Sequence, residues 1–136
     1  VELCGHIEVM AGNNHNMTIK VDETGVGGGV VDILQSRGYK NVIGINFGSK
    51  PQDTDKFADL PSEMWCTFPI SDVSLLNDSG LFHELTDRRF SYDHKARRVV
   101  ESKDSYKARN NGKSPDKADS VLMLFYEPKI NRPMLY

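Results

Sequence analysis

Three aspartates stand where their carboxylates could bind divalent cations. Asp22 follows Met17–Val21, a β-branched run that predicts a strand, and ligands of open α/β sheets gather at the carboxyl ends of strands. Asp116 and Asp119 are three residues apart at the start of a predicted final helix, so they would project from one face. Taken alone, Asp22 also fits a turn, and the pair also fits a first turn that complements the helix dipole. With a basic region between them, the three acids predict a two-metal phosphodiesterase site.

The basic region lies between these acids in the sequence. Residues 88–117 hold ten Lys or Arg against four Asp or Glu, whereas the remainder holds seven against fifteen, and the net charge is −2. Such polarisation predicts one face for a polyanion and another that is acidic. A solvated, charged hairpin explains the same pattern without any ligand, so charge alone leaves both interpretations open.

The first third of the chain predicts helices that alternate with strands. Apolar spacing indicates a helix over residues 1–10, which Gly12 ends. A strand at 17–21, a turn at Gly25–Gly29, a helix from 30 to 37 capped by Gly38, and a strand at 42–45 follow. This order is typical of an α/β fold with a parallel sheet.

The rest of the chain predicts short helices around a hairpin. After a loop over residues 46–60, Ser62 would cap a helix that runs to Phe68 before Pro69. A short helix is predicted at 81–85, and the segments 90–92 and 97–101 predict a β-hairpin with a turn at 93–95. After a loop at 110–113, Ser114 as N-cap and Pro115 at the first helical position would open a final helix to residue 126.

The glycine cluster Gly25–Gly29 offers a different function, a loop that cradles a phosphate. It does not complete the dinucleotide fingerprint, because Val30 occupies the last glycine position, and no Gly-Lys-Ser/Thr ending follows. We therefore expect a tight strand-to-helix turn in which the backbone packs closely. A nucleotide-binding α/β domain that uses this turn stays as an alternative.

Length and composition restrict the remaining classes. The 136 residues predict one domain, and no apolar run approaches the roughly 18 residues of a membrane span. Cys4 and Cys66 match neither a CxxC pair nor a disulfide-dense scaffold, which favours a reducing cytoplasm. The four histidines show no metal-ligand spacing and are expected at the surface. The composition is that of an ordinary globular protein.

A series of motifs resembles the large subunits of phage terminases. The segment Val21–Leu34 resembles the stretch after their second catalytic acid, and Gly38-Tyr39 with Val42–Ser49 resembles the strand and loop that follow. The resemblance continues, in the same order, through Ala58–Trp65, Glu84–Thr86, Phe90–Asp93, Glu101–Asp104 and Ser114–Asp119. Each motif is short, and the ordered set, which spans nearly the whole chain, carries the resemblance.

This resemblance implies a ribonuclease H-like, three-layer α/β fold in which helices flank a mixed central sheet, with an added β-hairpin. Residues 1–136 would form one nuclease domain that cuts concatemeric double-stranded DNA with Mg²⁺ or Mn²⁺. Asp22 corresponds to the acid on the later central strand, and Asp119, with Asp116 beside it, to the acidic pair of the last helix. Asp119 ranks first because its Ala-Asp step most resembles the family motif.

The resemblance also implies partners. Lys103 and Lys107, in or just after the Glu-Ser-Lys-Asp stretch, are candidate DNA contacts, and the hairpin and the following loop add Arg97 and Lys113. The portal protein and the small terminase subunit would be protein partners, and no membrane is expected. The setting would be the cytoplasm of a bacterial host, with the protein encoded by a phage or prophage.

Two departures from the family pattern affect the expected activity. The first catalytic aspartate of the family lies on an opening strand for which this sequence has no counterpart, and the packaging ATPase domain, which would use ATP, is likewise outside it. We therefore expect a fold incomplete at its N-terminus and a chain with little cutting activity of its own. A catalytically inactive fragment that binds DNA or a partner is the alternative. Pro69 also interrupts a helix that continues in the family.

Overall fold

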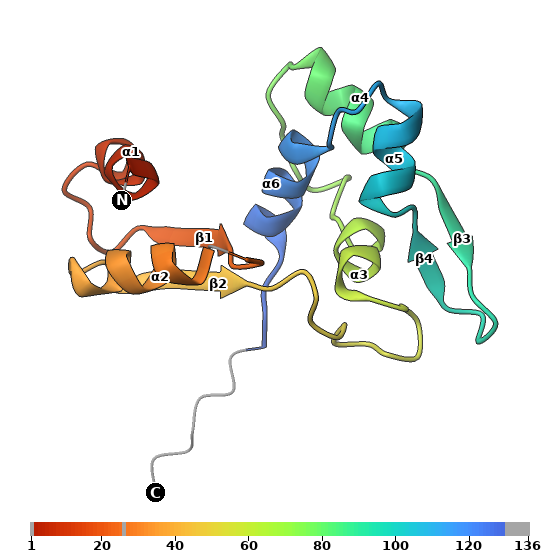
Figure 1. The fold of residues 1–136 in the computed structure, drawn as a ribbon, viewed down its shortest axis with the longest axis horizontal. Coiled ribbons are helices and arrows are strands. Elements are labelled where there is room, and N and C mark those ends of the chain that lie inside the picture. Colours follow the sequence, from red (N-terminus) through yellow and green to blue (C-terminus); the bar gives the residue numbers. More distant parts are fainter. Residues whose placement is uncertain (1, 26, 130–136) are drawn as a thin grey trace, which may run out of the picture. The chain divides into compact units, whose positions relative to one another are not determined.

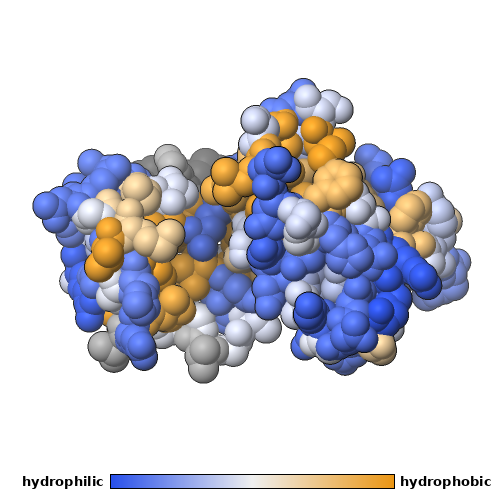
Figure 2. Space-filling model, turned by 90° about the horizontal axis from the view of Figure 1, so that it is seen from above, coloured by the Kyte–Doolittle hydropathy of each residue, from blue (hydrophilic) through white to orange (hydrophobic). Residues whose placement is uncertain are grey.

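The computed structural model describes residues 2–25 and 27–129. The chain divides into two compact units, Val1–Gly48 and Ser49–Tyr136, and each is described by itself (Figure 1). None of the described helices is long and apolar enough to cross a membrane. Apolar residues remain among polar ones on the surface of both units (Figure 2).

The first unit is a parallel strand pair covered by helices. Its elements are α1 (Glu2–Ala11), β1 (Thr18–Asp22), α2 (Gly27–Ser36) and β2 (Asn41–Ile45). The strands pair in parallel from Thr18 opposite Asn41 to Asp22 opposite Ile45, with α2 as the crossover. This order confirms the prediction for the first third of the chain. Its core consists of Cys4, Ala11, Leu34, Tyr39 and Val42.

The glycine cluster does not form the loop that the sequence predicts. Helix α2 already begins at Gly27, so three of the glycines lie in its first turn, and only Gly25, with φ of +81°, belongs to the preceding turn. A Cβ atom at Gly27 would stand 1.8 Å from the carbonyl oxygen of Asp22. Glycine is therefore needed at this position because the helix packs directly against the end of β1, as the close-packing interpretation expects.

The second unit packs four short helices around an antiparallel hairpin. It contains α3 (Leu60–Cys66), α4 (Ser79–Asp87), β3 (Phe90–Tyr92), β4 (Arg98–Val100), α5 (Lys103–Arg109) and α6 (Asp116–Phe125). The hairpin pairs Phe90 with Val100 and Tyr92 with Arg98, as predicted. Helix α3 packs on β4, and both α3 and α4 pack on α6. The buried apolar residues of this unit are Phe57, Leu60, Met64, Leu81, Val100, Tyr106, Ala118 and Leu122.

Local details differ from the predictions at three helices. Asp59, not Ser62, caps α3, and Pro61 stands in its first turn. Helix α5 occupies a segment for which no helix was predicted, between the hairpin and the loop at 110–113. At α6, Pro115 takes the N-cap position without a side-chain hydrogen bond, so Ser114 is not the cap.

The mixed α/β composition and the hairpin agree with the predicted fold class. Within the described residues the strands form two separate two-stranded sheets, one parallel and one antiparallel. Organisation of the whole chain as one domain stays a prediction.

Candidate metal site and basic face

Asp119 is the most enclosed of the three candidate acids. It lies one turn into α6 and is only 7% exposed. The Lys103 ammonium, from α5, is 2.7 Å from its Oδ2 atom, and Arg88 Nη1, from the end of α4, is 3.9 Å from Oδ1. This contact is an ion pair, because Oδ2 has no partner in hydrogen-bond geometry among the described residues. A buried carboxylate is thus kept between two cations.

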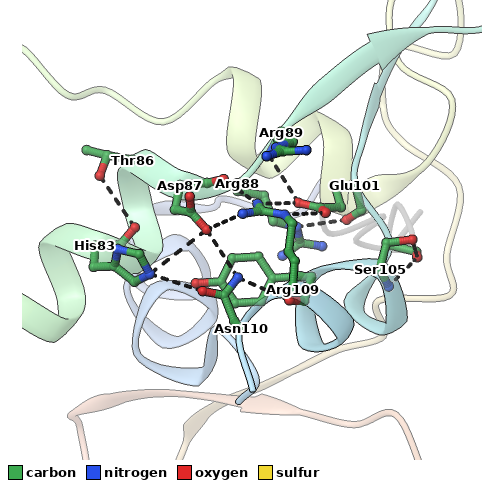
Figure 3. A network of polar contacts seen from close by, with 11 residues as sticks. His83, Thr86, Asp87, Arg88, Arg89, Glu101, Ser105, Arg109 and Asn110 are labelled. Carbon is green, nitrogen blue, oxygen red and sulfur yellow. Dashed lines mark hydrogen bonds and ion pairs between the residues drawn. The ribbon is translucent and has the colours of Figure 1, made fainter. Parts of the chain in front are cut away.

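Arg88 is itself buried in the interior of the second unit. Its side chain is 3% exposed, and its guanidinium carbon lies 5.1 Å from the ring centre of Trp65 and 5.8 Å from that of Tyr106. Its Nε atom donates to the carbonyl of Glu101 at 2.8 Å (Figure 3). Desolvation lowers the pKa of Arg88, and the charge of Asp119 opposes that change. The arginine stays charged, because an arginine pKa starts far above neutrality, and it balances Asp119.

Asp116 and Asp119 differ in environment although they are three residues apart. Asp116 begins α6 and is exposed to solvent, whereas Asp119 is buried. Between them, the amide of Ala118 donates to Glu84 Oε2 at 2.8 Å, which satisfies one of the open N–H groups of the first turn. The structure thus separates the predicted pair into a solvent-facing and an enclosed carboxylate.

Asp22 lies at the carboxyl end of β1, as the sequence predicts. Its Oδ1 atom accepts a hydrogen bond from the amide of Thr24 at 2.9 Å, and the amide of Glu23 donates to the carbonyl of Ile45. The Glu23 side chain lies across β2, where a Cβ atom on Gly44 would stand 1.6 Å from Glu23 Oε2. Two adjacent carboxylates are therefore present at this end of the parallel pair, and the sequence prediction named only the first.

The donor set fits a hard divalent cation, which prefers carboxylate oxygens. Asp119 contributes an oxygen with no hydrogen-bond donor, and Asp22 keeps one oxygen beyond its bond to Thr24. Among the described residues, no group of three or more His, Cys, Asp or Glu side chains could hold a metal ion. The convergence of Asp22 with Asp116 and Asp119 stays a prediction.

A clamp of ion pairs orders the elements around Asp119. Arg109, from α5, bonds both Asp87 on α4 and Glu101 at the end of the hairpin (Figure 3). Hydrogen bonding from Arg109 lowers the pKa of Glu101, and hydrogen bonding from Asn110 is the main cause that lowers the pKa of Asp87. The pKa of Arg109 is raised in turn, chiefly by Glu101. Both carboxylates are engaged by the clamp, which makes them positioning groups.

The four predicted DNA contacts differ in their ion pairing and in their exposure to solvent. Lys103 is paired with Asp119, and Arg97 is paired with Asp93, with Nη2 2.8 Å from Oδ2. Lys107 is half-buried on α5. Lys113 is exposed and borders a polar cleft of about 440 Å³, whose other lining residues include His83, Tyr106, Arg109, Asn110 and Lys117. The structure brings one predicted contact, Lys103, against a predicted metal ligand.

Sequence reasoning missed the residues that hold Asp119 in place. Arg88 and the exposed Arg89 are adjacent arginines, and no spacing signal distinguishes the buried one. Glu63 was also missed: it is 6% exposed, and its two oxygens accept from the amides of Gln52 and Asp53. Because both oxygens are satisfied, Glu63 fixes a loop.

Comparison with known proteins now gives the class of fold. No protein-family profile matches the chain, and no curated protein matches it by comparison. Among solved structures, the chain has the ribonuclease H-like α/β fold of phage terminase nuclease domains, which confirms the predicted fold class.

The particular structures come from the large terminase subunit of bacterial virus Sf6. A lysine-to-alanine variant of its nuclease domain with manganese matches at a TM-score of 0.70 and 14% identity, over 92% of this chain and 72% of that one. The same variant with calcium matches at a TM-score of 0.69. The nuclease domain without the substitution matches at a TM-score of 0.68 and 15% identity. Each of these two matches covers 92% of this chain and 71% of the other. At such identities the likeness establishes the fold alone.

Proposed function

We propose that this chain acts as the metal-dependent endonuclease domain of a viral DNA-packaging terminase, and that its substrate is concatemeric double-stranded DNA. The single observation that carries the proposal is the buried Asp119 carboxylate, held against Lys103 on a terminase-nuclease fold. A buried carboxylate is costly unless it is paired or coordinates a metal. Asp119 also lies in the first turn of α6, where the resemblance to terminases assigns a catalytic acid.

The residues that would hold Mg²⁺ or Mn²⁺ are Asp22 and Asp119, with Asp116 as the solvent-facing member. When bound, a pair of such ions activates water and neutralises the leaving 3′ oxygen of the phosphodiester. The carboxylates orient that site, and Asp22 is fixed for this role by its hydrogen bond to Thr24. ATP would belong to a separate packaging domain.

Lys103 has two effects on this site. Its ammonium neutralises Asp119 at 2.7 Å and so lowers the cost of burying the acid. The same contact competes with a cation for Oδ2. Because the Lys103 side chain is 42% exposed, we expect that it can also turn toward a DNA phosphate.

The other basic residues would follow the DNA backbone. Lys107, Lys113 and Arg97 are the proposed phosphate contacts, and phosphate contacts position a duplex without reading its sequence. The portal protein, the small terminase subunit and the cytoplasm of a bacterial host belong to the same proposal.

The test is calorimetric titration of the 136-residue chain with Mn²⁺, together with cleavage of supercoiled plasmid, for which little activity is expected. Asp22→Ala and Asp119→Ala should each weaken Mn²⁺ binding and abolish the cutting that the chain shows. Asp104→Ala, which removes an exposed acid from the first turn of α5, is the matched control and should change neither. Cutting that persists in both variants would refute the assignment of the acids.

A second candidate function is an inactive fragment that binds DNA or a partner. It is favoured by the observation that the described residues contain no group of three or more His, Cys, Asp or Glu side chains that could hold a metal ion. DNA binding without Mn²⁺-dependent cutting would support it over the nuclease. The nucleotide-binding alternative gains no support, because three of its glycines lie inside α2.

A further inference from the structure

A pocket between α3 and the hairpin is not used by the proposed metal site. It has a volume of about 330 Å³, which falls in the range of small-ligand sites, roughly 300–1,000 Å³. It is lined by Trp65, Cys66, Arg88, Phe90, Arg98 and Val100. All six residues belong to the second unit.

The strand register explains why these side chains gather. Phe90 pairs with Val100 and Tyr92 with Arg98, and side chains at paired positions of a sheet share one face. Helix α3 packs on β4, so this face of the hairpin is the one turned toward Trp65 and Cys66. The pocket is therefore built by two rigid elements.

The aromatic residues of this face are exposed to a degree that packing alone does not explain. Phe90 is 61% and Tyr92 60% exposed, and their rings meet edge to face at 6.0 Å. All three residues of β3 are exposed. Trp65, at the opposite wall, buries an indole N–H that has no hydrogen-bond partner among the described residues. Exposed aromatic rings beside a buried donor without a partner are features that a bound ligand would explain.

The charge of the pocket indicates the kind of ligand. Two of the six lining residues are arginines, and none of these six described residues is acidic. Arg98 lies opposite Tyr92 in the hairpin, so its guanidinium belongs to the same face as the aromatic rings. Stacking rings combined with a guanidinium suit a ligand that has both a flat ring and a negative charge.

We propose that this pocket binds an unpaired nucleotide of DNA, with its base stacked on Phe90 and its phosphate on Arg98. This pocket proposal rests on the proposed nuclease function in one respect, which is that DNA is taken as the ligand. Arg88 contributes to the pocket wall and also lies 3.9 Å from Asp119. A nucleotide held here would therefore be separated from the proposed metal ligand by one arginine side chain, and the pocket would hold one strand unpaired beside the cut site.

Tryptophan fluorescence can measure binding in this pocket, because Trp65 is the only tryptophan of the chain. The experiment titrates the 136-residue protein with a single-stranded oligothymidine of about ten nucleotides, a length within the site sizes of single-strand binders. Trp65 fluorescence should be quenched and should saturate. A blunt duplex of the same length should quench it only at concentrations higher by about tenfold or more, because its bases are stacked and paired.

Matched variants distinguish stacking from general attraction. Phe90→Ala should weaken binding of the oligothymidine by about fivefold or more, the effect of losing one stacked base. Phe82→Ala removes a phenylalanine that is 70% exposed on α4, outside the pocket, and should bind like the wild type. Arg98→Gln should weaken binding and reduce its salt dependence, whereas Arg89→Gln, also at the hairpin but outside the pocket lining, should weaken it less.

Each outcome supports or overturns the pocket. Wild-type binding by Phe90→Ala, equal affinity for duplex and single strand, or no saturable quenching would overturn it. If Asp22→Ala abolishes Mn²⁺-dependent cutting while Phe90→Ala binds oligothymidine normally, only the pocket fails. If Asp22→Ala and Asp119→Ala bind Mn²⁺ like the wild type but Phe90→Ala loses binding of oligothymidine, the pocket stands and the nuclease proposal fails.

Discussion

In the first unit the candidate acid is placed by backbone, whereas in the second it is placed by other side chains. Asp22 stands at the end of β1 because the parallel pair and the start of α2 fix that residue, and its own bond is to the amide of Thr24. Asp119 stands on a helix whose rotation is set by packing, and its carboxylate lies between Lys103 and Arg88. Different substitutions should therefore disturb the two acids.

The comparison shows where each kind of positioning can fail. A backbone-placed acid depends on close approach of main chains, which glycine permits, and is insensitive to distant charges. An acid placed by ion pairs depends on every partner in the network, because removing one partner leaves a buried charge uncompensated. The following predictions test this difference, in order of decreasing expected effect.

The largest effect is expected at Arg88. Arg88→Ala should lower the free energy of unfolding by about 3–5 kcal/mol, because it leaves Asp119 buried without one cation and removes a group packed between Trp65 and Tyr106. Chemical denaturation followed by circular dichroism measures the loss. Arg89→Ala, at the exposed neighbour, should change stability by less than about 0.5 kcal/mol. Equal effects of the two substitutions would mean that Arg88 does not organise the second unit.

The next effect tests the backbone placement of Asp22. Gly27→Ala should destabilise the protein by about 1–3 kcal/mol, because the new Cβ would meet the main-chain carbonyl of Asp22 at 1.8 Å, and a main chain cannot swing aside as a side chain does. Gly28→Ala is the matched control in the same helical turn. Its Cβ would meet nothing within 4 Å, so it should stabilise α2 by about 0.5–1 kcal/mol. Opposite signs in thermal denaturation are expected, and a stabilising Gly27→Ala would contradict this account.

The same contrast explains how much the sequence could predict. The elements of the first unit follow from apolar spacing and turn residues, so its strands, its helices and the position of Asp22 were predicted to within a few residues. The error at Gly27–Gly29 arose because glycine is read as a breaker, while here the three glycines form the first turn of α2, and Gly27 is required there by the close approach of Asp22. The hairpin was predicted correctly for the same local reasons.

The second unit was harder because its helices are defined by tertiary and polar contacts. Helix α5 buries only Tyr106, so it has no apolar stripe, yet Ser102 caps it and Lys107 with Arg109 complement its dipole. Those signals were present and could have predicted it. The burial of Asp119 could not be predicted, because it depends on Lys103 and Arg88, which come from other elements.

A smaller effect is expected from pH at the Arg109 clamp. The pKa of Glu101 lies below its ordinary value of 4.5, chiefly through hydrogen bonding from Arg109. A depressed carboxyl pKa adds stability above the ordinary value, and that stability is lost as the pH falls through the folded pKa. Arg109→Gln should therefore lower the free energy of unfolding at neutral pH, and lower it less below about pH 4. Parallel stability curves for the two proteins from pH 7 to pH 3 would contradict the clamp.

The smallest effect is expected at Asp116, and it separates the two members of the acidic pair. Asp116 is exposed at the N-terminus of α6, where its charge interacts favourably with the helix dipole, so Asp116→Asn should cost about 0.3–1 kcal/mol. Asp119→Asn should cost more, about 1.5–3 kcal/mol, because it leaves Lys103 and Arg88 facing a neutral amide. High salt screens exposed charges, so it should reduce the cost of Asp116→Asn and leave most of the cost of Asp119→Asn. Urea denaturation of both variants at low and high salt measures these differences. If Asp116→Asn costs as much as Asp119→Asn and is equally insensitive to salt, then the first turn of α6 is organised around both acids, and the distinction between an exposed and an enclosed carboxylate fails.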